Sequence, residues 1–245
     1  MQIYGMSDIG LTRESNQDVF YCYRKDENFC FAFVCDGMGG QNGGDVASNM
    51  VLNFFSKNIP KEFEKDIKDE EIKKLVFSYY EKINKDIFDV ANANELLNGM
   101  GTTCSTVVIR NNKMMIFNVG DSRVYLKKDK FLRQLTVDHS YVQTLVDCGD
   151  ITKEEAKTHP RKNEITNAVG ILENIKIDYK EIEVQKDDFV LLCSDGLTNQ
   201  CSDEIIGDII EKEKDIKDSV KNLIDISNFN GGKDNITVIL IKIWK

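Results

Sequence analysis

The chain has 245 residues, which is long enough for one large domain or two small ones. Acidic residues outnumber basic ones by 41 to 32, and the net charge of −9 argues against a nucleic-acid-binding protein, which would carry a basic surface. No run of about 18 apolar residues predicts a membrane span and no signal peptide precedes the first polar segment, so we expect a cytoplasmic protein.

Short segments rich in β-branched and aromatic residues, each near a glycine or asparagine turn, predict strands. In chain order they cover residues 19–23, 29–35, 105–110, 114–119, 123–128, 177–183, 189–193 and 236–243. Apolar residues at helical spacing predict helices over 45–58 and about 70–92. Two shorter helices are expected within 203–228, with Ser202 as the N-cap of the first.

The order of these segments lacks strict alternation of strands and helices, which disfavours a doubly wound parallel sheet. Residues 29–35 and 190–193 are apolar at consecutive positions, so both faces of these strands should be buried. We therefore expect an α+β fold in which mostly antiparallel sheets are covered by helices. The chain is predicted to form a single domain over 1–245, with a polar, partly helical surface flap at about 139–168.

Acidic residues recur at the ends of the predicted strands. They are Asp18, Asp36, Asp121, Asp195 and Asp234, three of them beside glycine. Turn chemistry alone explains any one of these acids, but five would converge if their strands shared one sheet edge, and a cation would then have to offset their repulsion. An all-oxygen set favours Mg²⁺ or Mn²⁺ over zinc, and the seven cysteines contain no CxxC pair and indicate buried thiols.

Seven short motifs occur in the order and spacing of a known family. They are RESNQD, VCDGMGG, GMGTT, NVGDSRVY, LTVDHS, CSDGL and KDNITV. From residue 7 to residue 241 the chain resembles the metal-dependent Ser/Thr protein phosphatases of the PP2C type (the PPM family), and it is most similar to the compact bacterial branch. The resemblance implies a four-layer αββα sandwich of two mostly antiparallel sheets flanked by helices.

The resemblance also implies roles for the acids. Asp36 would bridge two cations, and the carbonyl of Gly37 would complete the second. Asp195 and Asp234 would bind the first cation, and Asp18 would support the cluster through bound water. The cofactors expected are therefore two core Mn²⁺ or Mg²⁺ ions and a third, more weakly bound ion.

The remaining site residues are implied in the same way. Asp121, together with Asp195, would bind the third ion, and Arg13 would grip the substrate phosphate, for which a guanidinium fork is well suited. Asn235 would orient Asp234 or a bound water. A hydroxide shared by the two core cations would attack phosphorus directly, with no covalent phospho-enzyme.

Three positions depart from the family or complicate the assignment. Met38 stands where eukaryotic members have a histidine proposed to protonate the leaving group, so that acid is unassigned, with a metal-bound water preferred and His159 as the second candidate. His139 is expected to make structural hydrogen bonds. Asn167 occupies a position that often holds arginine, so substrate recognition could differ.

Two other segments are similar to known phosphate-binding patterns. Cys104 and Arg110 have the C-x5-R spacing of cysteine-dependent phosphatases, but the β-branched residues between them predict a strand that holds the two apart, and no neighbour in sequence is expected to lower the thiol pKa. The glycines of residues 37–44 match neither the dinucleotide-binding nor the P-loop pattern.

The expected function is therefore dephosphorylation of phosphoserine and phosphothreonine. The alternatives left open are a catalytically inactive relative that only binds or regulates, and a phosphatase of small phosphate esters. The expected partners are phosphorylated proteins, including a bacterial Ser/Thr kinase and its substrates, with no nucleic acid and no membrane. The protein is expected to be a monomer.

Overall fold

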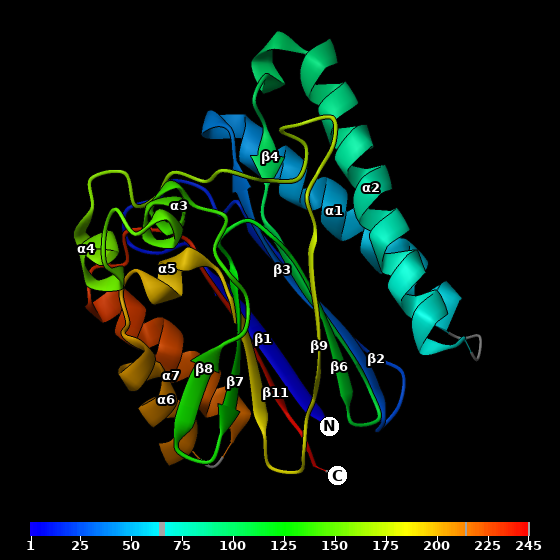
Figure 1. Ribbon diagram of the computed structural model, residues 1–245, viewed down its shortest axis with the longest axis vertical. Helices are drawn as coiled ribbons and strands as arrows, with labels where there is room; N and C mark the ends of the chain where they lie inside the picture. Colours follow the sequence, from blue (N-terminus) through cyan, green and yellow to red (C-terminus); the bar gives the residue numbers. More distant parts are fainter. Residues whose placement is uncertain (64–66, 214, 245) are drawn as a thin grey trace.

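A computed structural model describes residues 1–63, 67–213 and 215–244. Two sheets form its centre, and all of the strand pairings in the described residues are antiparallel (Figure 1). The first sheet has the order β1 (Gln2–Asp8), β11 (Ile236–Lys242), β10 (Phe189–Cys193), β7 (Arg123–Lys128) and β8 (Phe131–Gln134). The second has the order β2 (Asp18–Arg24), β3 (Phe29–Met38), β5 (Cys104–Arg110), β6 (Lys113–Val119) and β9 (Asp178–Glu183), with β4 (Gly101–Thr102) beside β3.

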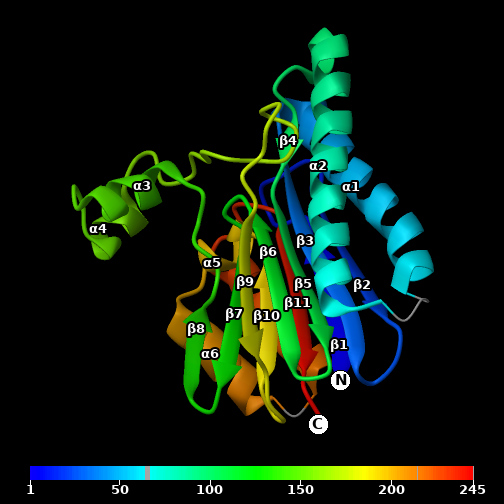
Figure 2. The same cartoon turned by 45° about the vertical axis from the view of Figure 1, so that its right-hand side comes forward.

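Helices cover the outer face of each sheet. The second sheet is covered by α1 (Gly40–Phe63) and α2 (Asp69–Ala93), and the first by α5 (Asp195–Thr198), α6 (Asp203–Lys212) and α7 (Ile216–Phe229) (Figures 1 and 2). One apolar core lies between the two sheets, and one lies under each helical layer. The expected α+β sandwich of two antiparallel sheets flanked by helices is confirmed.

The flap region stands off from the sheets and carries two short helices. These are α3 (Tyr141–Cys148) and α4 (Lys153–Thr158), which Figure 2 shows to one side of the strands. Ser140 and Thr152 cap them through their side chains. The partly helical character expected for 139–168 is present.

Several element boundaries differ from the sequence expectation. Helix α1 begins at Gly40 rather than at residue 45, and it continues through Pro60 to Phe63 because Ile59 and Phe63 are buried in the core under it. Strands β1, β4 and β8 and the helical turns η1 (Glu95–Leu97) and α5 were not predicted. Ser202 does cap α6, since its hydroxyl accepts a hydrogen bond from the backbone N–H of Ile205.

The described helices include none with the length and apolar character needed to cross a membrane.

Candidate active site

A cleft of about 630 Å³ opens where strands of both sheets end. Most of the site residues expected from the sequence line it: Arg13, Asp36, Gly37, Asp121, Asp195 and Asp234. Met38 and two flap residues, Asn163 and Ile165, complete part of its wall. Asp18 and Asn235 are buried next to this lining.

The acids come from both sheets, and the expectation of one shared sheet edge was wrong. Asp18 and Asp36 belong to β2 and β3 of one sheet, whereas Asp195 and Asp234 flank β10 and β11 of the other. Asp121 lies in the connection from β6 to β7, which passes from one sheet to the other. Face-to-face packing brings these strand ends together at a single cleft.

Alternation along β3 explains why its acid reaches this cleft. Phe33 and Cys35 pack under the helices, whereas Val34 packs between the sheets. Successive strand residues point to opposite faces, so Asp36 follows Val34 toward the space between the sheets. Asp18 lies directly opposite Asp36 in the pairing of β2 with β3. Two like charges opposite each other destabilise an antiparallel pair unless something neutralises them.

The GMGTT motif holds the backbone of Asp36. The Asp36 N–H donates to Thr103 Oγ1 at 2.8 Å, and the Asp36 carbonyl accepts from the Thr103 N–H at 2.8 Å and from Thr102 Oγ1 at 2.9 Å. Both threonines are fully buried. Sequence reasoning noted this motif but gave its threonines no role, because nothing in the sequence shows that β4 pairs with the end of β3.

In Asp18 and in Asp195, one carboxylate oxygen accepts a hydrogen bond from a neutral side chain. Ser194 Oγ donates to Asp18 Oδ2 at 2.6 Å and accepts from the Thr237 N–H at 3.0 Å. Asn199 Nδ2 donates to Asp195 Oδ2 at 2.8 Å. The sequence analysis did not identify Ser194, Thr237 or Asn199, although Ser194 lies within the CSDGL motif that it quoted.

Burial and mutual repulsion oppose ionisation of these acids. Burial raises the pKa of Asp18 from 3.8 to about 7, and the charges of Asp195 and Asp234 add to this. Burial, followed by the charge of Asp234, raises the pKa of Asp195 to about 6. The pKa values of Asp36 and Asp121 are raised well above 3.8 for the same two reasons, burial first and neighbouring carboxylates second.

The donor set fits a divalent cation. Oδ1 of Asp18, Asp121 and Asp195 is buried and has no hydrogen-bond partner in the part of the chain that the structure describes. A buried carboxylate oxygen without a partner is costly unless a cation binds it. Among residues 1–63, 67–213 and 215–244, no three His, Cys, Asp or Glu side chains are already close enough together to hold an ion. The carboxylate oxygens that lack partners are hard ligands of the kind that Mg²⁺ and Mn²⁺ prefer.

Arg13 lies at the edge of the acid cluster. Its Nη2 donates to Asp234 Oδ2 at 2.7 Å, and its side chain is 50% exposed in the cleft. Partial burial lowers the pKa of Arg13, but the hydrogen bond to Asp234 and the charges of Asp234, Asp36 and Asp195 raise it by more. The guanidinium is therefore a fixed positive charge beside the carboxylates.

Asn235 holds the loop that carries Arg13. Its Oδ1 accepts from the Gln17 N–H at 2.8 Å, and its Nδ2 donates to the carbonyls of Ile9 and Ser15 at 2.9 and 3.0 Å. The Asn235 backbone N–H, and not its side chain, donates to Asp234 Oδ1 at 2.9 Å. The side chain thus positions the loop, and the role of orienting Asp234 or a bound water stays a prediction.

Comparison with known proteins decides the family. A family model for protein phosphatase 2C matches residues 12–240. The chain belongs to the protein phosphatase 2C family.

Two curated relatives and two solved structures illustrate the likeness. The chain is 38% identical over 236 residues to the serine/threonine phosphatase Stp of Listeria welshimeri, covering 96% of this chain and 93% of the relative. It is 34% identical over 241 residues to the protein phosphatase PhpP of Streptococcus pneumoniae, covering 98% and 97%.

Among solved structures, Stp1 of Staphylococcus aureus superposes with a TM-score of 0.93 at 34% identity, covering 100% of this chain and 95% of that one. The catalytic domain of the phosphatase PstP, solved in complex with two manganese ions, superposes with a TM-score of 0.86 at 31% identity, covering 100% and 98%. The expected enzyme class, a Ser/Thr protein phosphatase, is confirmed by these relatives and by the family.

The positions that depart from the phosphatase family are resolved in part. Met38 lines the cleft, but the described lining contains no histidine, and the Nδ1 atom of His159 accepts from the backbone of Arg161 at 3.1 Å. Position therefore does not support His159 as the proton donor. His139 is buried and hydrogen-bonded, as expected, and Asn167 donates to its Nδ1 at 2.9 Å instead of lining the cleft.

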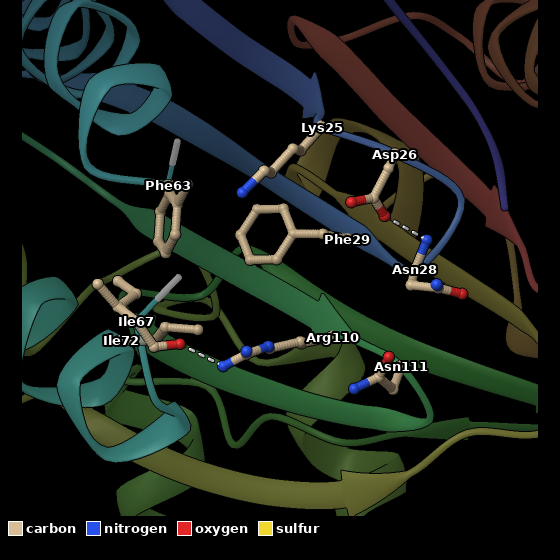
Figure 3. A pocket seen from close by; sticks show the side chains of 9 residues that line it. All are labelled: Lys25, Asp26, Asn28, Phe29, Phe63, Ile67, Ile72, Arg110 and Asn111. Carbon is tan, nitrogen blue, oxygen red and sulfur yellow. Dashed lines mark hydrogen bonds between the residues drawn. The ribbon is translucent and has the colours of Figure 1, made fainter. Parts of the chain in front are cut away.

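The C-x5-R pair is not a second phosphate site. Cys104 and Arg110 are the two ends of β5, roughly 20 Å apart at the usual rise of a strand. Figure 3 shows Arg110 in a separate hollow, where it donates to the backbone carbonyl of Ile67. This hollow has a volume of about 210 Å³, and Arg110 also donates to Asp69 at 3.2 Å.

The expectation that no neighbour would lower the pKa of the Cys104 thiol was wrong. Burial raises the pKa of Cys104, but hydrogen bonds with Cys35, Tyr80 and Thr106 lower it by more. Those partners are neutral groups inside the core and supply no cradle for a phosphate.

Proposed function

We propose that the protein is a metal-dependent phosphatase that hydrolyses phosphoserine and phosphothreonine in proteins, using Mn²⁺ or Mg²⁺. One observation carries the proposal: a half-exposed arginine lines the cleft beside Asp121 and Asp195, and Oδ1 of these two acids and of the adjoining Asp18 is buried with no hydrogen-bond partner in the described residues. The PstP relative that was solved with two manganese ions supports the choice of a divalent cation.

The acids divide into holders of two core ions and of a third. Asp36 and the Gly37 carbonyl would hold the core ions together with Asp195 and Asp234, and Asp18 would support them through water. A Cβ atom on Gly37 would lie 2.2 Å from the carbonyl oxygen of Gly44. Only glycine at position 37 therefore lets the start of α1 pack this closely against the residue whose carbonyl would bind the cation. When bound, two such cations lower the pKa of a shared water so that hydroxide is available near neutral pH.

The third and weakest ion would be held by Asp121 with Asp195. Both carboxylates have a buried Oδ1 with no partner among the described residues. Burial is the largest cause that raises the pKa of Asp121, and the charge of Asp195 is the next. A further positive charge would relieve this repulsion. The occupancy of this place should depend most strongly on cation concentration, because two side chains serve it and one of them is shared.

Arg13 would bind the phosphate group. It is the one arginine in the described lining of the cleft, and its guanidinium presents several N–H donors of which Nη2 is bound to Asp234. A planar fork matches two phosphate oxygens and offsets charge that develops on them during phosphoryl transfer. Exposure of half of the side chain leaves it free to reorient toward a substrate.

The wider role follows from the relatives. We propose that the substrates are phosphoproteins, including those phosphorylated by a bacterial Ser/Thr kinase, and that the chain acts as a single catalytic domain, with a flap over 139–168, as a monomer in the cytoplasm. Asn163 and Ile165 of the flap line the cleft, which supports contact between the flap and the protein part of a substrate.

Hydrolysis assays test this function. Para-nitrophenyl phosphate and a phosphothreonine peptide should both be hydrolysed with Mn²⁺, and EDTA should abolish turnover of both. The Asp36→Ala and Asp195→Ala variants should be inactive but folded, with Asp208→Ala as a control for loss of an exposed acid. Turnover that persists in EDTA or in either variant would contradict the metal mechanism, and turnover of the small ester alone would contradict the protein substrate.

A further inference from the structure

The backbone of the Gly120–Asp121 corner sets the position of one proposed cation ligand, Asp121. Asp121 Oδ1 has no partner in the described residues, so side-chain hydrogen bonds do not fix this oxygen. Gly120 has φ of +103°, and a Cβ there would come within 2.5 Å of the Thr103 side chain. The corner is therefore a conformation that glycine adopts readily, and its neighbours must hold it in place.

His139 forms hydrogen bonds with both the N–H and the carbonyl of Gly120. The Gly120 N–H donates to His139 Nδ1 at 3.2 Å, and the Gly120 carbonyl accepts from the His139 N–H at 3.0 Å. The His139 side chain is buried. The first contact orients the Val119–Gly120 peptide, and the second orients the Gly120–Asp121 peptide that immediately precedes Asp121.

The surrounding donors fix the state of the ring. Asn167 Nδ2 donates to the Lys176 carbonyl at 2.7 Å, which sets the orientation of the amide, and it also donates to His139 Nδ1 at 2.9 Å. Nδ1 faces two N–H donors, so it accepts and carries no proton. The ring proton is then on Nε2, which donates to Asp178 Oδ2 at 3.1 Å.

The same histidine closes the neck of the flap. It lies where the flap begins, and the Thr166 N–H at the end of the flap donates to the His139 carbonyl at 2.8 Å. Ser140 and Ile165 form an isolated β-bridge next to it. Both ends of the flap are thus joined at the residue that holds Gly120.

We propose that His139 is a positioning residue that holds Asp121 in place for its cation and, through Asn167 and Thr166, couples the position of the flap to that ligand. The inference rests on the proposed function, because it requires a weak third cation at Asp121. His139 touches neither substrate nor cation in this scheme and acts through the Gly120 backbone. It follows that flap movements on substrate contact change the affinity of the third site.

Cation binding and amide exchange test the proposal. Binding of Mn²⁺ is measured by calorimetry and by the electron paramagnetic resonance signal of free Mn²⁺, and exchange at residues 118–123 by mass spectrometry. His139→Ala should weaken the weakest Mn²⁺ site by about tenfold or more, the usual effect of losing a residue that orients a ligand, and leave the two tighter sites within about twofold. Amide exchange at 118–123 should rise in the metal-free protein.

Two further variants separate positioning from general damage. His139→Asn keeps an acceptor where Nδ1 lies, and it should restore most of the weak-site affinity. Asp188→Ala removes another buried side chain, one that accepts from the Gln185 N–H in the turn before β10, and it should lower thermal stability without weakening any cation site. Asp121→Ala should lack the weak site, and adding His139→Ala to it should cause no further loss.

The outcomes are distinct. If His139→Ala leaves the weak site unchanged, or weakens all sites equally, the positioning role is wrong. If wild type and Asp121→Ala bind the same number of ions, the third-ion part of the proposed function fails, and this inference falls with it. If the wild type hydrolyses no phosphate ester, the proposed function fails before any histidine variant is compared.

Discussion

Replacing Asp18 by asparagine should stabilise the metal-free protein at alkaline pH. Asp18 is buried, lies opposite Asp36 across β2 and β3, and accepts one hydrogen bond from Ser194. Asparagine has nearly the same shape and can still accept that bond through its carbonyl oxygen, but it carries no charge. The substitution therefore removes an unfavourable buried charge while conserving the packing.

The magnitude follows from the pKa of Asp18. Burial raises this pKa from 3.8 to about 7. Below pH 3.8 the group is protonated whether the chain is folded or unfolded, and its stabilising contribution relative to the ionised state is fully present. As the pH rises to about 7 that stability is lost, and the difference of about 3 in pKa corresponds to about 4 kcal/mol.

Urea unfolding in EDTA measures this effect. Wild-type metal-free protein should lose stability between pH 4.5 and pH 8, whereas the Asp18→Asn variant should lose less and should exceed the wild type at pH 8 by up to about 4 kcal/mol. Asp208→Asn is a suitable control, because it also removes one negative charge but lies exposed beside Lys212 in α6. That control should change stability by less than about 1 kcal/mol.

Saturating Mn²⁺ should reverse the order. In the wild type, the positive charge of bound Mn²⁺ offsets the charge of Asp18. The asparagine variant has no charge at this position and should gain less stability from Mn²⁺, so the wild type should become the more stable protein. Equal pH dependence of the two metal-free proteins, or a metal-free variant less stable than wild type at pH 8, would refute the account of Asp18 as a buried charge awaiting a cation.

Three other changes separate the roles within the cleft. Asp36→Asn should lower kcat/KM on the order of 10³-fold or more and abolish tight Mn²⁺ binding, which calorimetry would detect; tight binding that survives would contradict its bridging role. Arg13→Ala should lower kcat/KM for para-nitrophenyl phosphate by about 10²-fold with Mn²⁺ affinity nearly intact, and Arg13→Lys should recover only part of it; equal loss of both properties would contradict phosphate binding. Thr103→Val leaves the Asp36 N–H without its acceptor and should cost about 1–3 kcal/mol of unfolding free energy in urea, whereas Thr103→Ser should cost much less.

Much of the fold could be predicted because several strands have a clear apolar sequence pattern. Residues 29–35 and 189–193 are apolar throughout and include β-branched or aromatic residues, and the strands β3 and β10 contain them. Strand β1 was missed because its residues are only half-buried and include Gly5, so the run lacks both alternation and a continuous apolar stretch. Strand β8 has four residues with alternate exposure, too short a signal to separate from the turn before it.

The acids of the site could be identified, but their arrangement could not. A carboxylate at a strand end is visible in sequence, and the five aspartates were found in this way, three of them beside glycine. That they come from two sheets depends on long-range pairing, such as the register of Asp18 opposite Asp36. The hydroxyls of Thr103 and Ser194 were not identified because buried serine and threonine are common in strands, and only the folded chain shows which carboxylate or amide each one meets.

The supporting hydrogen bonds share one chemical feature that favours the proposed binding of cations. The groups that hold the acids are neutral: a hydroxyl of Ser194 on Asp18, an amide of Asn199 on Asp195, and backbone or hydroxyl groups of Thr103 around Asp36. A lysine or arginine in these places would lower the carboxylate pKa values but would also satisfy their charge and compete with a cation. Neutral donors fix the geometry without neutralising the carboxylates, and burial, followed by the charges of neighbouring acids, raises the pKa values of Asp18 and Asp195. Arg13 is the exception at the rim, where it donates to Asp234 from a half-exposed position; in the proposed function it would release that carboxylate to bind a phosphate.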